Sequence, residues 1–222
     1  MVSIMLANNE VGTIQPIKEI SAICHEFDII VHCDAAQAVG KMPVNVNELG
    51  IDLLSIAGHK FYAPKGVGAL YCRGEFRPCA VICGTNQESG IRSGTSNVSG
   101  IAGLGKAAEL ARLELEANHH LHIKEMRDDL EAKLLQKFPD ARVNAQGAER
   151  LPLIISIGFP GLVGHEVMKT LSDKMCFSAG AACYTGKGSA TLSAMNVNPA
   201  IARGTIRLSF GRFVLFLNFN RI

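Results

Sequence analysis

The sequence lacks the features that mark secreted, membrane-spanning and nucleic-acid-binding proteins. Its 22 basic and 20 acidic residues leave a formal charge of +2, so no charge excess points to nucleic acid or to an acidic membrane surface. Its apolar runs are too short to span a bilayer. Residues 1–6 carry neither the basic lead nor the cleavage site of a signal peptide. What remains is a globular protein of one large or two small domains.

Disulfides and metal clusters are also poorly supported. The seven cysteines are an odd number in a chain without secretory features, which favours free thiols in a reducing compartment, with the cytoplasm as the default location. Cys79 and Cys83 lie close in sequence, but no second pair completes a tetrahedral zinc set. His119, His120 and His122 lie in a charged helical stretch, where a solvated helix face is the commoner explanation. We therefore predict no metal site.

What the sequence does contain is an alternation of apolar strands and helices. Residues 2–7 are typical of a buried parallel strand, 17–27 carry the apolar face of a helix, and 29–33 form a second strand. A strand, a helix and a strand within about 33 residues make one right-handed crossover of a parallel sheet. The runs 52–56 and 67–72 extend that pattern. We therefore expect an α/β fold with a mainly parallel sheet.

The rest of the chain predicts a long helical region and a smaller second domain. Residues 98–138 are helical in pattern, as one long helix or as two in tandem. A strand at 153–157 and a helix at 164–171 then indicate a small α+β domain. We place the domain boundary near Ala117. The predicted parts are a partial large domain at 1–117, a small domain at 118–212 and an atypical apolar tail at 213–222.

Two polar residues follow apolar strands in a way that points to chemistry. Lys60, in the turn after the strand at 52–56, is placed like a shielded amine that forms a Schiff base. Asp34 ends its own strand, where a carboxylate can keep a pyridinium nitrogen protonated. Taken alone, each is more often an ordinary turn or loop residue. Ligands of parallel sheets bind beyond the carboxyl ends of the strands, and Asn9, Asp34 and Lys60 all follow strands, so the set favours a pyridoxal phosphate (PLP) site.

Other residues have both a functional and a structural interpretation. The polar, glycine-rich segment 84–95 is either a flexible connector or an anion site formed by Arg92, Thr95 and backbone N–H groups. Small residues flank Cys183, which suits a thiol that a loop presents to a bound substrate. Arg207 lies inside a strand-like run, where it either makes a surface salt bridge or clamps a substrate carboxylate.

Six short motifs follow one another along the chain. They are Asn8–Gly12, His32–Gln37, Gly58–Lys60, Arg92–Thr95, Gly180–Cys183 and Ile206–Arg212. In this order they resemble the PLP-dependent cysteine desulfurases and selenocysteine lyases of the class V aminotransferase group, from about Met5 to Arg212. The resemblance implies the fold of the PLP-dependent transferases, which is aspartate aminotransferase-like (fold type I), with a small α+β C-terminal domain.

The resemblance also implies which residues hold the cofactor. Lys60 would carry the internal aldimine and later move the substrate's Cα proton. Asp34 would pair with the pyridinium nitrogen of PLP. Gln37 and Asn9 would contact the region of the ring's phenolic oxygen, and His59 would contact the phosphate.

For the reaction, the resemblance implies roles for three more residues. Thr95 would reach the phosphate bound by the other subunit of a homodimer, and Arg207 would hold the substrate's α-carboxylate. Cys183, as a thiolate, would assist removal of selenium from selenocysteine or take sulfur from cysteine, leaving alanine. Ala57 stands where many desulfurases have a phosphate-binding serine, so we prefer selenocysteine. A cysteine desulfurase that passes persulfide sulfur to an acceptor protein for Fe–S clusters is the alternative.

The sequence departs from the family pattern in ways that leave other functions open. The pattern has an N-terminal portion with a threonine phosphate cup and a ring-stacking histidine, and a C-terminal helix after Arg212, which this sequence lacks. Thr85-Asn86 replaces the usual glycines. We therefore expect a shortened form, and an inactive dimerisation partner is a further alternative. An ordinary aminotransferase is another, although transamination would need no thiol at Cys183.

Overall fold

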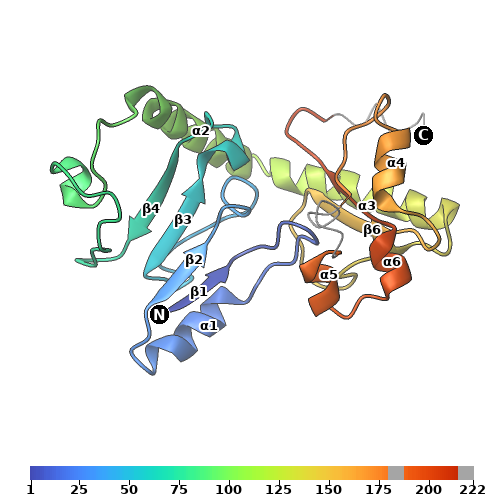
Figure 1. The fold of residues 1–222 in the computed structure, drawn as a ribbon, viewed down its shortest axis with the longest axis horizontal. Helices are drawn as coiled ribbons and strands as arrows, with labels where there is room; N and C mark the ends of the chain where they lie inside the picture. Colours follow the sequence, from blue (N-terminus) through green and yellow to red (C-terminus); the bar gives the residue numbers. More distant parts are fainter. Residues whose placement is uncertain (180–187, 215–222) are drawn as a thin grey trace. The chain divides into compact units, whose positions relative to one another are not determined.

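The chain folds into two compact units, seen in a computed structural model that describes residues 1–179 and 188–214 (Figure 1). Unit 1 consists of Met1–Leu6 and Gln15–Ala117, and unit 2 consists of Ala7–Ile14 and Asn118–Ile222. The segment Ala7–Ile14 departs from the prediction, which placed it in the N-terminal domain. Its backbone pairs with the C-terminal part of the chain instead, since the Leu151 amide donates to the Gly12 carbonyl at 2.8 Å.

A four-stranded sheet in the order β1-β2-β3-β4 forms the centre of unit 1 (Figure 1). Its strands are β1 (Val2–Met5), β2 (Val31–Asp34), β3 (Leu53–Ala57) and β4 (Gly68–Cys72). β1, β2 and β3 are mutually parallel. Val31 and Cys33 of β2 are fully buried, whereas His32 is half-buried and Asp34 exposed, the alternation expected of a strand covered on one face. The predicted buried strand at 2–7 is a half-exposed edge strand of this sheet.

The last strand of this sheet runs in the opposite direction to the other three. The sequence pattern predicted that residues 67–72 extend the parallel series, but β4 pairs with β3 in antiparallel register. Only the short 3₁₀ helix η1 (Gly58–Phe61) and a few further residues connect β3 to β4. A parallel crossover needs a dozen or more residues, so this connection allows only an antiparallel return.

Two α-helices and a second 3₁₀ helix complete unit 1. They are α1 (Ile17–His25), α2 (Val98–Glu116) and η2 (Gln87–Gly90). α1 buries Ile17 and Cys24, but Ile23 and Phe27, predicted on its apolar face, are exposed. Ala107 and Ala111 of α2 pack against Phe61 of η1. These small side chains let α2 approach closely and fix the turn that carries Lys60.

A three-stranded antiparallel sheet in the order β5-β6-β7 forms the centre of unit 2. Its elements are β5 (Arg142–Val143), β6 (Ile154–Gly158), β7 (Thr205–Ser209), α3 (His119–Lys137), α4 (Gly164–Thr170), α5 (Ala190–Ala194) and α6 (Pro199–Arg203). Ile155, Ile157, Ile206 and Leu208 form the core with Leu130 of α3. Both α3 and α6 pack on β6 (Figure 1).

The helical region predicted at 98–138 is a tandem pair, α2 and α3. Ala117 ends α2, and Asn118 precedes α3 with a left-handed φ of 58°. Asparagine tolerates this conformation better than most residues, which explains the break at this position. No helix within the part of the chain that the structure covers is long and apolar enough to cross a membrane.

Candidate active site

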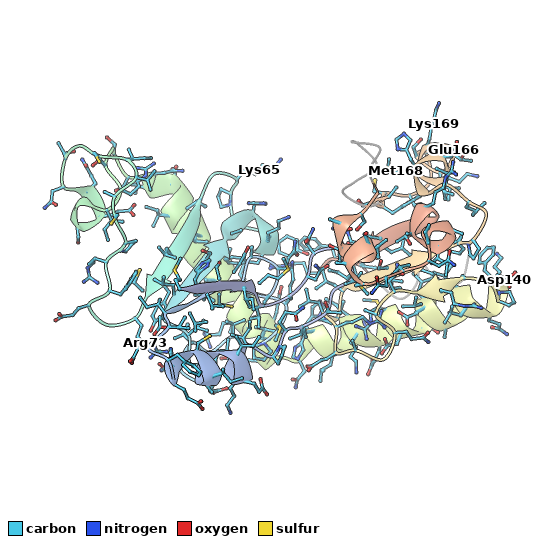
Figure 2. The ribbon with its side chains drawn as sticks, turned by 60° about the horizontal axis from the view of Figure 1, so that its bottom comes forward. Lys65, Arg73, Asp140, Glu166, Met168 and Lys169 are labelled. Atoms are coloured by element: carbon cyan, nitrogen blue, oxygen red, sulfur yellow. The ribbon has the colours of Figure 1, made fainter. Side chains whose placement is uncertain are left out.

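Two of the predicted site residues lie at the same end of the sheet in unit 1. Asp34 closes β2 and pairs in register with Ser55 of the adjacent parallel strand β3. Lys60 follows the end of β3, in η1. Lys65 precedes β4 and Arg73 follows it, so in Figure 2 these two labelled side chains mark the site end and the opposite end of the sheet. The parallel arrangement of β2 and β3 therefore brings the carboxylate and the amine to one edge.

The carboxylate of Asp34 is exposed and only partly engaged. Its Oδ1 accepts from the backbone N–H of Ala36 at 2.9 Å, and the Ala35 amide donates to the Ser55 carbonyl at 3.0 Å. These two bonds fix the start of the loop after β2. Burial, helped by the neighbouring charge of Asp34, raises the pKa of the Cys33 thiol to about 11. Cys33 therefore stays protonated at neutral pH and is unsuited to act as a nucleophile.

The turn η1 points Lys60 outward. Gly58 and Phe61 are buried while His59 and Lys60 are exposed, so the turn places two polar side chains on one surface. A Cβ atom on Gly58 would lie 2.7 Å from the Val67 carbonyl oxygen, so only glycine fits there. The shielded lysine expected from the sequence is thus exposed, and neither it nor His59 forms a hydrogen bond or ion pair among the described residues.

Gln37 lies in the same loop as Asp34 and is half-buried. Its side-chain oxygen Oε1 accepts from the ammonium of Lys41 at 2.9 Å. The resemblance alone pointed to Gln37, and sequence reasoning missed Lys41. A lysine four positions after a glutamine is a common spacing, which gave no reason to select it.

The chemistry of these side chains fits PLP. Asp34 can hold a proton on a pyridine nitrogen, Lys60 can bond to an aldehyde, and the Gln37 amide and the His59 ring can donate to anionic oxygens. Each of these four side chains keeps at least one polar atom without a partner in the described part of the chain, so that atom is available to a bound group.

In unit 2 the structure joins Asn9 to Arg207. Arg207 lies in β7, and its Nη1 donates to the Asn9 carbonyl at 2.7 Å. Its Nε is buried and has no hydrogen-bond partner among residues 1–179 and 188–214, and no ion pair involves Arg207 in that part. The guanidinium therefore keeps donor capacity for an anion, whereas the alternative surface salt bridge is not seen within that range.

The motif Asn8–Gly12 is a tight turn in unit 2. The side chain of Asn8 accepts from the amides of Glu10 and Val11, at 2.8 and 2.9 Å. Gly12 has a φ of +82°, and a Cβ there would lie 3.2 Å from Ile154. This geometry explains why asparagine occupies position 8 and glycine position 12. The Asn9 carbonyl of the same turn accepts from Arg207.

Glu10 ties this turn to α5. Its carboxylate accepts from the hydroxyls of Ser189 and Thr191, at 2.5 and 2.9 Å. Sequence reasoning assigned Glu10 no role, because its partners lie about 180 positions further along the chain.

Thr95 and Cys183 stay predictions. Thr95 is exposed in unit 1. Its contact with a second subunit stays a prediction, because the structure contains one chain. In the segment before Thr95, Gln87 accepts from the Thr85 hydroxyl at 2.5 Å and from the Gly94 amide at 3.2 Å, and both interpretations of that segment stay open. Cys183 lies outside the described residues, as does the tail after residue 214.

Comparison with known proteins decides the family. The model described as "Aminotransferase class-V" matches residues 1–216. The chain belongs to the class-V aminotransferase family. The chain is 44% identical, over 216 residues, to the protein named cysteine desulfurase IscS of Dictyoglomus turgidum. This match covers 96% of this chain and 55% of that relative. The chain is also 44% identical, over 215 residues, to the cysteine desulfurase IscS of Methanosarcina thermophila, covering 96% and 53%. The class-V chain thus spans about half the length of these curated relatives.

Solved structures show the same relationship. A NifS-like protein from Rickettsia africae superposes with a TM-score of 0.87 at 33% identity, covering 96% of this chain and 57% of that one. A protein titled "SspA in complex with cysteine" gives a TM-score of 0.76 at 32% identity, covering 96% and 59%. The predicted fold type I is therefore confirmed, and PLP is the cofactor of this class-V family.

Proposed function

We propose that the chain is part of a PLP-dependent cysteine desulfurase, which removes the sulfur of cysteine and leaves alanine. The observation that carries the proposal is the placement of Asp34 and Lys60 at the ends of two adjacent parallel strands. The curated relatives are named for this activity, and one similar structure is titled as a complex with cysteine. These names support sulfur over selenium as the element removed.

In this proposal each residue of the candidate site has its own role. When bound, PLP supplies an electron sink for the substrate's Cα. Lys60 would hold the cofactor through its aldehyde, and its amine would move the substrate's Cα proton once the substrate has taken its place. Asp34 keeps the pyridine nitrogen protonated. Arg207 binds the substrate carboxylate through donors that its bond to Asn9 leaves over.

The last step in the proposal is sulfur transfer. The Cys183 thiolate attacks the substrate sulfur, the Cβ–S bond breaks, and Cys183 becomes a persulfide. The electron pair of the broken bond stays with the three-carbon product, which takes up protons and leaves as alanine. The persulfide then serves an acceptor protein, and Thr95 takes part in the phosphate site of a second subunit in a homodimer.

Selenocysteine lyase is the second candidate function. Ala57 ends β3 immediately before η1 and brings no hydroxyl to this end of the sheet, as the selenium alternative expects. A side-by-side rate comparison on cysteine and selenocysteine, with alanine as the common product, separates the two. Release of a keto acid instead of alanine would point to an ordinary aminotransferase.

The proposal is tested first by cofactor binding. Addition of PLP to the purified chain is expected to produce a visible absorbance band, and borohydride reduction is expected to fix the cofactor on the peptide that contains Lys60. Lys60→Ala should abolish both signals and lower any desulfurase rate by at least about 100-fold. Lys18→Ala, an exposed lysine of α1, should leave both signals unchanged.

If this test fails, the remaining alternative is an inactive chain that serves as a dimerisation partner. A chain that shows no band at saturating PLP cannot be a desulfurase by itself. Co-elution of the chain with a full-length relative on size-exclusion chromatography would then favour a non-catalytic dimerisation partner.

A further inference from the structure

The loop after β2 contains a side-chain pair whose chemistry fixes the orientation of an amide. The ammonium of Lys41 lies 2.9 Å from one terminal atom of the Gln37 side chain. An ammonium has three donors and no acceptor, so the atom that faces it must be the amide oxygen. The oxygen and nitrogen of a glutamine are otherwise easily exchanged. Here the lysine excludes the exchanged orientation.

The consequence is that the Gln37 amide nitrogen lies on the side away from Lys41. Its two N–H donors make no hydrogen bond to any residue within 1–179 or 188–214. Gln37 shares its loop with Asp34, whose Oδ1 accepts from the Ala36 amide. The loop therefore presents a carboxylate and an oriented pair of N–H donors at the end of the sheet where Lys60 also lies.

The backbone between the two side chains is held firmly enough to maintain this geometry. The amides of Ala38 and Val39 both donate to the Ala35 carbonyl, and the Lys41 amide donates to the Ala38 carbonyl at 3.0 Å. Gly40 has a φ of +76°, and a Cβ there would lie 2.8 Å from the Cβ of Phe61. The turn is thus packed directly against the η1 turn, with no room for it to move inward.

We propose that Lys41 is a positioning residue for the cofactor. Its ammonium holds the Gln37 oxygen, and Gln37 in turn offers N–H donors to the anionic phenolic oxygen of bound PLP. The proposal rests on the proposed function. Without Lys41 the amide can turn its oxygen toward the phenolate, where two acceptors repel each other and a donor is lost.

The first measurement follows the bound cofactor by its absorbance. Lys41→Met removes the ammonium and keeps most of the aliphatic chain. It is expected to weaken PLP binding by about 3- to 10-fold, the effect of one lost hydrogen bond. It should also raise the pH at which the absorbance of bound PLP changes, because the phenolic oxygen becomes more basic. The matched control Lys18→Met, an exposed lysine of α1, should change neither quantity.

A double-mutant cycle tests whether Lys41 acts through Gln37. Gln37→Met removes the donors directly and should reproduce the changes in affinity and pH profile. Lys41→Met should then have no further effect in the Gln37→Met background. An equal effect of Lys41→Met in both backgrounds would overturn the proposal, because the lysine would then act through its charge alone.

A second readout needs no cofactor. In the apo chain labelled with ¹⁵N-glutamine, the side-chain amide signal of Gln37 should be that of a fixed group, and Lys41→Met should make it mobile. A signal equally mobile in both chains would overturn the proposal.

The proposed function and the positioning role can fail separately. A wild-type chain without a PLP band would remove the proposed function and the positioning role with it. A wild-type band whose affinity and pH profile Lys41→Met leaves unchanged would overturn the positioning role alone.

Discussion

At the scale of single residues, Asp52 binds several partners at the end of the sheet opposite the candidate site. It stands just before β3, where its Oδ2 accepts from the Val31 amide at 2.9 Å and lies 3.0 Å from Nε2 of His25. Arg73, labelled in Figure 2, brings its Nε to 4.0 Å from Oδ1. Partial burial raises the pKa of Asp52, but the hydrogen bonds and the charges of His25 and Arg73 outweigh it, so this pKa lies below its usual range.

This lowered pKa predicts a specific acid dependence of stability. Because the folded-state pKa is below the unfolded one, Asp52 stabilises the chain above the unfolded pKa, about 3.9, and the contribution is lost as the pH falls through the folded value. Asp52→Asn should lower the free energy of unfolding at pH 7 by about 1–3 kcal/mol. The gap between the two chains should shrink below about pH 4, as urea unfolding across pH would show. Asp28→Asn, at an exposed position, should have little effect. A gap independent of pH would contradict the assignment.

At the scale of elements, Gly40 joins the loop after β2 to η1. Gly40 and Gly66 both have positive φ, +76° and +82°, but only Gly40 is packed, with the Cβ of Ala111 3.3 Å and that of Phe61 2.8 Å from the place of a Cβ. Gly66→Ala should therefore cost only the backbone strain of about 1–2 kcal/mol. Gly40→Ala should cost about 1–3 kcal/mol more, because its methyl group overpacks against Phe61. Thermal unfolding of both variants isolates the packing contribution. Equal losses of stability in the two variants would show that η1 shifts to accommodate the methyl group without a cost in free energy.

Glu10 is the matching connection in unit 2, between the turn at Asn8–Gly12 and α5. Glu10→Ala leaves the hydroxyls of Ser189 and Thr191 without their acceptor and should lower the free energy of unfolding by about 1.5–3 kcal/mol. Glu149→Ala, an exposed carboxylate of the same unit, should change it by less than about 0.5 kcal/mol. Urea unfolding of the double variant Glu10→Ala, Thr191→Val should show a loss in the free energy of unfolding that is smaller than the sum of the two single losses. Full additivity would mean that the two side chains do not interact.

The elements also show what the sequence could predict. Asp34 and Lys60 were found because each follows an apolar run, which is a local signal. The direction of β4 and the partners of Glu10 are set by pairing with distant parts of the chain, and no local pattern carries that information. Gln37 was selected only through the resemblance, whereas Asn9 was selected because it follows a strand and Arg207 because it lies inside one. Their hydrogen bonds to Lys41 and to each other depend on side-chain geometry that spacing does not determine.

At the scale of the whole molecule, unit 2 is discontinuous in sequence. The segment Ala7–Ile14 provides the Gly12 carbonyl that accepts from Leu151, and the Ile14 amide that donates to the Glu149 carbonyl at 3.0 Å. A fragment of residues 118–222 loses these bonds together with those of Asn9 and Glu10. At about 1 kcal/mol per bond, the loss is a large share of the 5–15 kcal/mol that stabilises a typical domain.

We expect this fragment to unfold at a lower urea concentration than unit 2 does in the intact chain. Attaching residues 7–14 to the fragment through a flexible linker should restore most of the difference. A matched fragment that carries residues 7–14 with Gly12→Val should not recover, because the turn needs a positive φ there. Equal midpoints for all forms would show that the segment contributes nothing to unit 2.

The bond between Asn9 and Arg207 has a consequence for how the polypeptide is made. The two residues are 198 positions apart. At a translation rate of about 5–20 residues per second, the turn at Asn9 leaves the ribosome about 10–40 seconds before its partner strand is available. Contacts of such long range slow the search for the native state, so unit 2 should be the last part of the chain to reach its native structure.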